Sequence, residues 1–412
     1  MIMRKYFLII AVIVPLMLQA QKNWQWRGEN RDGIYNESGL LKAWPEGGPT
    51  LLWKYEGLGA GYTSVAIANG KIYASGMTDD NLILFVFDMT GKLLTKKTVG
   101  KEWNVNFKGT RCSVLVHEGK LYIGNSLGQL FCLDETTLNE IWMKDGLKDF
   151  DGRNIMFGVT ENPLIVGNKI FLTPGGVKHG IVALNKDTGA LIWSSPGTGK
   201  QSSYCSPGFV GGYAVPMIIT SFAGEKGEGR ITYNTLNAFN TETGEMLWSH
   251  VIQSENDINP NTPLYSNGLI FFSTGYRGGS WQLRLKDNGR AVEQVWHNPA
   301  DDQHHGPVKV GDYVYLTSHT GNRGFYCIDW KTGETKYNAR HPQSAMVYAD
   351  GMLYAYGYDG KMYLIKPNPE KFEIVSSFNI TLGTDEHWAH PVIYQGVMYI
   401  RHGNALMAYK VK

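Results

Sequence analysis

One short pattern recurs along this chain and limits what the chain can fold into. The clearest copy is VALNKDTGALIW (Val182–Trp193), and the next is LNAFNTETGEMLW (Leu236–Trp248). Weaker copies are FCLDETTLNEIW (Phe131–Trp142) and YCIDWKTGETKY (Tyr326–Tyr337). In each copy an alternating apolar segment ends at Asp or Asn, passes through Thr-Gly or a substitute, and resumes with an aromatic residue. Because glycine tolerates positive φ and Asp or Asn can hydrogen-bond the turn backbone, each copy predicts a β-hairpin.

A second element precedes each hairpin and sets the number of repeats. It is an apolar strand punctuated by glycine, as in ANGKIYASG, HEGKLYIGN and VGNKIFLTP. The mean spacing of these glycines is about 47 residues, which is typical of four-stranded propeller blades. The sequence therefore predicts an all-β fold, an eight-bladed β-propeller of four-stranded antiparallel blades over residues 50–412. The marker glycines are Gly70, Gly119, Gly167, Gly211, Gly268, Gly311, Gly351 and Gly396.

The two ends of the chain supply complementary parts of one blade. The last unit ends after its third strand, whereas TLLWKYEG (residues 50–57) is a strand without a unit of its own and carries Trp53. We expect this strand to complete the last blade, because a closed ring leaves no open sheet edge for other chains to pair with. Residues 21–49 lack the blade pattern and are expected to pack against the ring as an N-terminal arm.

The first twenty residues predict export. Arg4 and Lys5 precede an apolar run from Phe7 to Leu18, and small residues follow, so we expect a signal peptide cleaved near Ala20. The run is too short to span a bilayer comfortably, and no cysteine of a lipobox follows it. The sequence therefore predicts a periplasmic or secreted protein with no transmembrane segment in the mature chain and no lipid anchor at this site.

The charge balance excludes one class of partner. The chain has 39 Lys and Arg residues and 37 Asp and Glu residues, and Arg4 and Lys5 would leave with the signal peptide. A mature chain so close to neutral argues against nucleic-acid binding, which needs excess positive charge on one face. The regular period, with 43% hydrophobic residues to fill a core, favours one circular domain. We expect this domain to be a monomer.

The repeats resemble those of a known family, the bacterial propellers built from pyrroloquinoline quinone (PQQ) enzyme repeats. This group includes the quinoprotein alcohol dehydrogenases and the outer-membrane assembly factor BamB. The shared pattern, a strand followed by Asp-x-x-Thr-Gly and then Trp, covers most of residues 50–412. WQWRGENRDGIY (Trp24–Tyr35) and HHGPVKVGDYVYL (His304–Leu316) are similar to a BamB-like subgroup of exported propellers.

The resemblance implies two functions. The first is a ligand-binding or protein-interaction scaffold in the bacterial cell envelope, with an envelope protein or a small polar ligand as its partner. The alternative is a PQQ-dependent alcohol or sugar oxidoreductase that uses calcium at the axial face. The quinoprotein dehydrogenases hold PQQ beneath a vicinal disulfide, but this chain has no adjacent cysteines. BamB is a lipoprotein, and the lipid-bearing cysteine is also missing. Both departures weaken a direct transfer of function.

Tryptophans recur near one position of the predicted outer strands. Periodic placement predicts a packing role, in which each side chain docks between neighbouring blades and buries a large apolar area. The alternative is an aromatic platform for a sugar or a quinone. The predicted docking residues are Trp53, Trp142, Trp193, Trp248 and Trp296.

Chemistry is expected where the blades meet the axis. The residues just before each inner strand should converge on one face of the ring, around the central channel. These residues form the predicted ligand-binding site, and no catalytic residue is assigned among them. They are Tyr62, Arg111, Glu161, Asn162, Tyr204, Asn261, His304, His305, His341, His387, Trp388 and His390.

Three interpretations of this set stay open at the level of sequence. The first is a site for a small polar or anionic ligand, with Arg111 as the charge partner and the histidines and Tyr204 as hydrogen-bonding groups. The second is a transition-metal site, with His304 or His305, His390 and His341 as candidate ligands. Consecutive residues of an extended segment point in opposite directions, so only one of His304 and His305 should face the axis. In the third, these groups satisfy buried strand ends and channel waters. Glu161 is a candidate general base.

Overall fold

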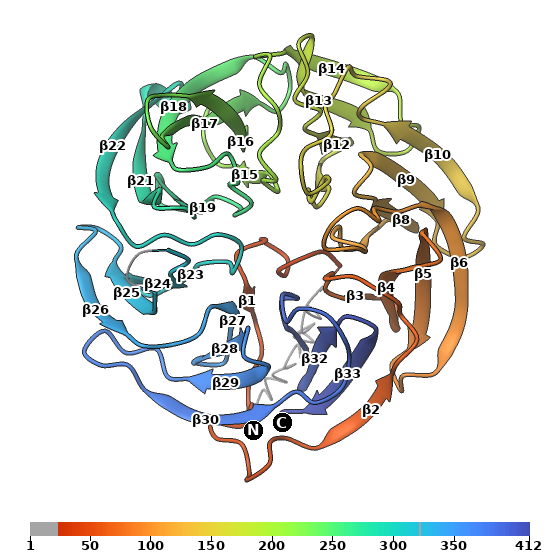
Figure 1. The fold of residues 1–412 in the computed structure, drawn as a ribbon. Coiled ribbons are helices and arrows are strands. Elements are labelled where there is room, and N and C mark those ends of the chain that lie inside the picture. The colour runs from red at the N-terminus through yellow and green to blue at the C-terminus, as the bar shows by residue number, and fades with distance from the viewer. Residues whose placement is uncertain (1–23, 321–322) are drawn as a thin grey trace, which may run out of the picture.

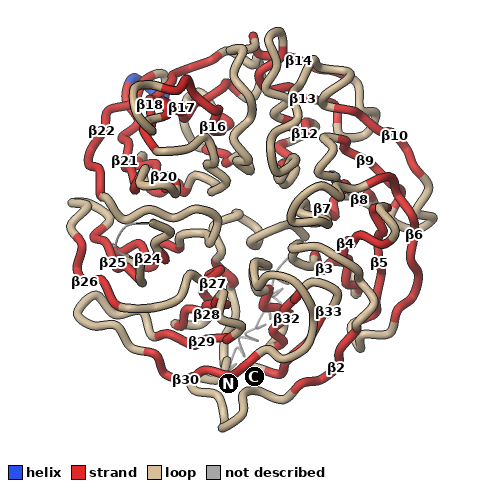
Figure 2. The backbone as a smooth tube through the Cα atoms, in the orientation of Figure 1, coloured by secondary structure: helices blue, strands red, loops and turns tan. Residues whose placement is uncertain are grey.

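The protein is a ring of eight β-sheets around a central axis (Figure 1). The computed structural model describes residues 24–320 and 323–412. Within these residues the only helical element is one 3-10 turn, Asp287–Gly289, and Figure 2 shows strands and loops making up the rest. The predicted all-β, eight-bladed propeller is confirmed.

Each blade is an antiparallel sheet whose first strand lies nearest the axis (Figure 1). The first blade comprises β3 (Ala66–Ala68), β4 (Lys71–Thr78), β5 (Asn81–Asp88) and β6 (Leu93–Lys101). The second comprises β7 (Leu115–His117), β8 (Lys120–Gly124), β9 (Gln129–Asp134) and β10 (Glu140–Asp145). The third comprises β11 (Leu164–Val166), β12 (Lys169–Leu172), β13 (His179–Asn185) and β14 (Leu191–Pro196). The fourth comprises β15 (Gly208–Val210), β16 (Met217–Lys226), β17 (Thr232–Asn240) and β18 (Met246–Ser254).

The second half of the ring repeats this order. The fifth blade comprises β19 (Leu264–Ser266), β20 (Leu269–Thr274), β21 (Gly279–Lys286) and β22 (Ala291–Asn298). The sixth comprises β23 (Val308–Val310), β24 (Tyr313–Thr317), β25 (Phe325–Asp329) and β26 (Thr335–Ala339). The seventh comprises β27 (Ser344–Ala349), β28 (Met352–Gly357), β29 (Lys361–Ile365) and β30 (Ile374–Asn379). The eighth comprises β31 (Val392–Tyr394), β32 (Val397–His402), β33 (Ala405–Lys410) and β2 (Leu51–Tyr55).

The repeated turns have the geometry that their residues predict. In the β13–β14 hairpin the Asn185 side chain accepts hydrogen bonds from the backbone of Asp187 (2.9 Å) and Thr188 (3.0 Å), and Gly189 has a φ of 69°. This left-handed φ favours glycine, and the asparagine oxygen satisfies two backbone donors that the turn leaves free.

The ring closes through the N-terminal strand, as predicted. Strand β2 pairs antiparallel with β33, with Trp53 opposite Ala408, and becomes the outermost strand of the eighth blade. Residues distant in sequence thereby share one sheet, which ties the two ends of the propeller together.

Tryptophan side chains connect successive blades. The indole nitrogen of Trp142 donates to the backbone oxygen of Lys186 (3.0 Å), and that of Trp296 donates to the oxygen of Trp330 (3.2 Å). Each acceptor lies in the turn of the following blade. Trp248 is equally buried, but its indole nitrogen has no hydrogen-bond partner among the described residues.

The N-terminal arm crosses the middle of the ring (Figure 1). Its short strand β1 (Ile34–Tyr35) pairs in parallel with β27, so the seventh sheet has a fifth strand. The predicted signal peptide, residues 1–20, and the first residues of the arm lie outside the described residues. No described helix has the length and apolar character needed to cross a bilayer.

Candidate ligand-binding site

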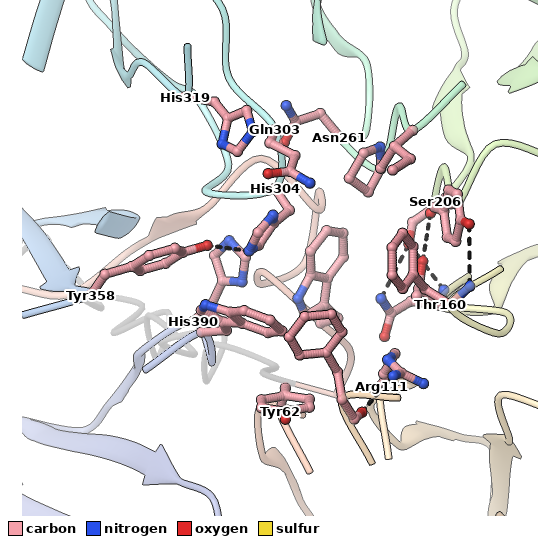
Figure 3. Close-up of a pocket in the computed structure, with 18 of the residues that line it drawn as sticks. Tyr62, Arg111, Thr160, Ser206, Asn261, Gln303, His304, His319, Tyr358 and His390 are labelled. Carbon is pink, nitrogen blue, oxygen red and sulfur yellow. Dashed lines mark hydrogen bonds between the residues drawn. The ribbon is translucent and has the colours of Figure 1, made fainter. Parts of the chain in front are cut away.

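A cavity of about 390 Å³ lies on the axis, where the segments preceding the inner strands converge. Figure 3 shows Arg111 on one side of this cavity and Tyr358 and His304 on the other. The wall combines residues from most of the blades with one residue of the arm. The lining residues are Trp26, Tyr62, Phe107, Arg111, Phe157, Thr160, Asn162, Tyr204, Ser206, Ile258, Pro260, Asn261, Tyr276, Gln303, His304, His319, Tyr358, Trp388 and His390.

Most of the predicted site residues meet in this wall. They come from different blades and converge because each precedes the inner strand of its blade. The predicted residues in the wall are Tyr62, Arg111, Asn162, Tyr204, Asn261, His304, Trp388 and His390.

Glu161 lies behind the wall, and its surroundings do not suit the general base expected from the sequence. Its carboxyl group accepts hydrogen bonds from the backbone nitrogen (3.0 Å) and hydroxyl (3.1 Å) of Thr173. Burial raises the pKa of Glu161 to about 8, although these hydrogen bonds and Arg31 act in the opposite direction. Burial therefore favours the protonated form, and both carboxyl oxygens are already hydrogen-bonded to Thr173.

His305 lies outside the wall, although its ring stacks on that of its neighbour His304, with 4.8 Å between ring centroids. The ring is fully buried, with Nδ1 3.3 Å from a carboxylate oxygen of Asp302. Only His304 lines the cavity, where its Nε2 is paired with the hydroxyl of Tyr358. The expectation that these consecutive side chains point in opposite directions is wrong, because the chain bends here instead of running extended and the two rings stack.

His341 and His387 are also absent from the wall. The His341 ring packs edge-on against Tyr363, with 4.7 Å between ring centroids, and burial lowers its pKa to about 4. The His387 ring stacks on His402 at 3.7 Å and bonds the hydroxyl of Tyr356. Aromatic neighbours in the seventh and eighth blades thus contact both rings outside the cavity.

The described residues offer no cluster of metal ligands. Among the described residues, no three His, Cys, Asp or Glu side chains form a group that could hold a metal ion. The candidates are occupied by protein partners: His304 by Tyr358, His305 by Asp302, and His390 by the backbone oxygen of His305 at 3.1 Å.

The cavity carries one formal charge. Arg111 is the only Lys, Arg, Asp or Glu residue among the described residues that line it. Burial lowers the pKa values of His304, His319 and His390, which keeps these three rings neutral at pH 7. The wall therefore has a positive charge and no negative one.

Arg111 is held in place from one side. Its Nη2 donates to the backbone oxygens of Asn106 and Phe107, whereas Nη1 is buried without a hydrogen-bond partner among the described residues. Burial lowers the pKa of Arg111 and the charge of Glu102 opposes this effect, but no ion pair joins the two side chains among the described residues. The guanidinium thus retains unused capacity to bind an anion.

The arm supplies a part of the site that sequence reasoning did not place there. Trp26 lines the cavity and meets the His390 ring edge-on at 5.4 Å. Its neighbours Arg27 and Arg31 are buried and lie 5.7 and 5.8 Å from the Trp26 ring. Arg27 donates to the backbone oxygen of Pro307 (2.9 Å), and Arg31 to that of Pro163 (2.7 Å). Two buried cations thereby fasten the arm to blades on either side of the axis.

Sequence reasoning also missed other lining residues, although the positions of some of them in the sequence could have indicated a place in the wall. Phe107 and Phe157 lie in the loops that precede Arg111 and Asn162, so the rule that found those two residues could have been extended. Tyr358 lies in the turn between β28 and β29, and no repeat feature marks it.

Comparison with known proteins places this fold in a family. The profile of the family described as outer membrane protein assembly factor BamB matches residues 79–339, which is more than half of the chain. The chain belongs to this family. Among solved structures, BamB from Moraxella catarrhalis superposes with a TM-score of 0.62 at 13% identity, covering 88% of this chain and 99% of that one. A europium-containing methanol dehydrogenase superposes with a TM-score of 0.65 at 12% identity, covering 93% and 90%. Identities this low support the shared fold alone.

Curated relatives of this BamB-family chain include quinoprotein dehydrogenases. The quinoprotein alcohol dehydrogenase PedH of Pseudomonas putida is 30% identical over 144 residues, which cover 34% of this chain and 23% of PedH. A quinoprotein ethanol dehydrogenase of P. putida is 22% identical over 303 residues, which cover 63% and 46%. The chain spans less than half the length of these two relatives.

PQQ with calcium does not fit the cavity of this BamB-family chain. Calcium takes oxygen ligands, carboxylates prominent among them, and no carboxylate lines the described wall. The four cysteines are buried free thiols, so the structure forms no disulfide for a quinone to lie against.

Proposed function

We propose that this protein is a non-catalytic ligand-binding propeller of the bacterial cell envelope. In this proposal the axial cavity holds a small ligand that carries negative charge, and Arg111 is its charge partner. Residues 1–20 are the export signal, and the mature protein works in the periplasm or outside the cell. BamB-family membership is consistent with an envelope role, although it does not name a ligand.

The proposal rests chiefly on the unpaired charge of Arg111. A buried cation is costly unless it is paired, and the Nη1 atom of Arg111 has no partner among the described residues. An anionic ligand would supply the missing partner for this atom, and hydrogen bonds between a guanidinium and an anion are among the strong ones. The neutral histidines and the uncharged side chains of Asn162 and Asn261 would not oppose the charge of such a ligand.

Anion binding by the exported, processed protein tests this function. Calorimetric titrations with acetate, benzoate, phosphate and gluconate should reveal binding by at least one of them, and Arg111→Met should weaken it about tenfold or more. Arg340→Met is the matched control, because Arg340 is exposed and lies outside the cavity. The proposal fails if none of these anions binds, or if both variants bind like the wild type.

A protein-interaction role and a PQQ-dependent oxidoreductase are the competing functions. The sequence match to quinoprotein dehydrogenases favours the second, whereas the missing carboxylates disfavour it. Incubation with PQQ and calcium, followed by gel filtration and dye-linked alcohol oxidation, separates them. Retained cofactor absorbance with turnover would overturn the non-catalytic proposal, and a stoichiometric envelope protein that co-purifies without turnover would favour the scaffold.

A further inference from the structure

The composition of the cavity wall narrows the class of ligand. Trp388 stands among other rings: its centroid lies 4.9 Å from that of Tyr62, 5.1 Å from Phe107 and 5.4 Å from His304. Phe107 also contacts Phe157 at 5.8 Å. Aromatic faces of this kind bind other flat rings by stacking and edge-to-face contact, and these contacts need no hydrogen bonds.

Most polar side chains of the wall already have hydrogen-bond partners within the protein. The Tyr62 hydroxyl donates to Glu386 (3.0 Å), and the Tyr358 hydroxyl is paired with His304. The Thr160 hydroxyl donates to the backbone oxygen of Tyr204 (2.9 Å).

The amide side chains are engaged in the same way. Gln303 donates to the hydroxyl of Tyr276 (3.1 Å), and the Asn162 amide nitrogen donates to the hydroxyl of Ser206 (3.1 Å). A sugar or peptide would need many free donors and acceptors, because each of its polar groups loses water on binding. This wall has few to offer.

Arg111 is the exception, and it limits the ligand to one negative charge. The cavity has a single guanidinium and no second cation among its described lining residues. A second anionic group on the ligand would be buried without a partner, which is costly. A volume of about 390 Å³ falls within the range of roughly 300 to 1,000 Å³ usual for small-molecule sites.

We infer that the cavity takes a small planar aromatic ring bearing a single carboxylate, with the ring against Trp388 and Phe107 and the carboxylate on Arg111. This inference rests on the proposed function, because it names the chemical class of the anion that the cavity would bind.

Titration with four compounds tests the inference. The probe is trans-cinnamate; cinnamamide lacks its charge, cyclohexanecarboxylate is a monocarboxylate without an aromatic ring, and terephthalate is an aromatic dicarboxylate. Cinnamate should bind the wild-type protein about tenfold or more tightly than each of the others. Arg111→Met should reduce cinnamate affinity to that of cinnamamide.

Two ring substitutions test the aromatic contact. Trp388→Leu and Phe107→Leu should each weaken cinnamate binding about tenfold and leave cyclohexanecarboxylate binding nearly unchanged. The Phe107 side chain is 43% exposed, so its loss should not unfold the propeller even if Trp388→Leu does. Phe209→Leu, which alters a 40% exposed phenylalanine outside this cavity, is the control.

The outcomes separate the inference from the function on which it rests. If cyclohexanecarboxylate bound as tightly as cinnamate and its binding depended on Arg111, the ligand would not need an aromatic ring. The proposed function would still stand. If cinnamamide or terephthalate bound as tightly as cinnamate, the inference that the ligand carries a single carboxylate would be wrong. Failure of every anion to bind would remove both the inference and the proposed function.

Discussion

The indole nitrogen of Trp193 donates a hydrogen bond to the backbone oxygen of Thr241, 3.0 Å away in the next blade. The same ring lies over Gly244, where an added Cβ would come within 2.5 Å of it. One side chain thus fills the space between two neighbouring sheets and satisfies a buried carbonyl. The contact belongs to the packing of the ring, and none of these three residues lines the axial cavity.

Trp193→Ala should therefore destabilise the fold without selectively removing ligand binding. Loss of a buried tryptophan costs about 3 to 5 kcal/mol, because a cavity remains where the ring was. Thermal and urea unfolding measure this loss. Ile192→Ala changes the adjacent 40% exposed residue and should have little effect. Normal stability of Trp193→Ala combined with lost ligand affinity would favour the aromatic-platform alternative instead.

Arg27→Met should loosen the arm. The guanidinium donates to the backbone oxygens of Met346 (3.2 Å), Pro307 (2.9 Å) and Asp32 (3.1 Å), and methionine would leave all three without this donor. A penalty on the order of 3 kcal/mol is expected, with faster hydrogen exchange of residues 24–35.

Lys42→Met is the control for that experiment. Lys42 also joins the arm to the seventh blade, through Asp350 at 2.6 Å, but its side chain is 56% exposed. Exposed pairs contribute about 1 kcal/mol or less. Unchanged exchange of residues 24–35 in Arg27→Met would show that other contacts hold the arm.

Chelation should leave the protein intact. His304 and His390 are already hydrogen-bonded to protein groups, and burial keeps their pKa values low, so no described imidazole cluster depends on a metal. The melting temperature should be the same with and without EDTA, and elemental analysis of untagged protein should find no stoichiometric transition metal. A bound metal together with a fall in melting temperature on chelation would revive the metal interpretation.

The ring could be predicted from sequence because its repeats are local. Each hairpin turn is specified by a few consecutive residues, such as Asn185 and Gly189, and the spacing of the repeats counts the blades. The position of Arg111 or Asn261 near the axis follows from the same topology, since every inner strand begins there.

Side-chain direction could not be predicted, because contacts distant in sequence decide it. His341 occupies the same kind of position as His304, yet it packs on Phe372, which belongs to the β29–β30 connection, at 5.4 Å. Trp26 lines the cavity beside Arg27 and Arg31, which donate hydrogen bonds to carbonyl groups in remote blades. The arm has no repeat, so no periodicity indicates where it lies.

Because the carboxyl group of Glu161 is buried, we expect the stability of the protein to depend on pH. Its pKa is about 8 in the folded protein, compared with an ordinary value of 4.5, so the folded state holds a proton that the unfolded state has lost between these values. The stability that this group contributes is fully present below pH 4.5 and is lost as the pH rises through about 8.

Glu161→Gln removes this titration but keeps an amide able to pair with Thr173. The free energy of unfolding of the variant, relative to wild type, should therefore rise as urea titrations move from pH 5 to pH 9. Each pH unit in this window is worth up to about 1.4 kcal/mol for one proton. Glu228→Gln, at an exposed position, should track the wild type. Parallel pH profiles for wild type and Glu161→Gln would mean that Glu161 is ionised in the folded protein, and Glu161 would then be available again as a general base behind the cavity wall.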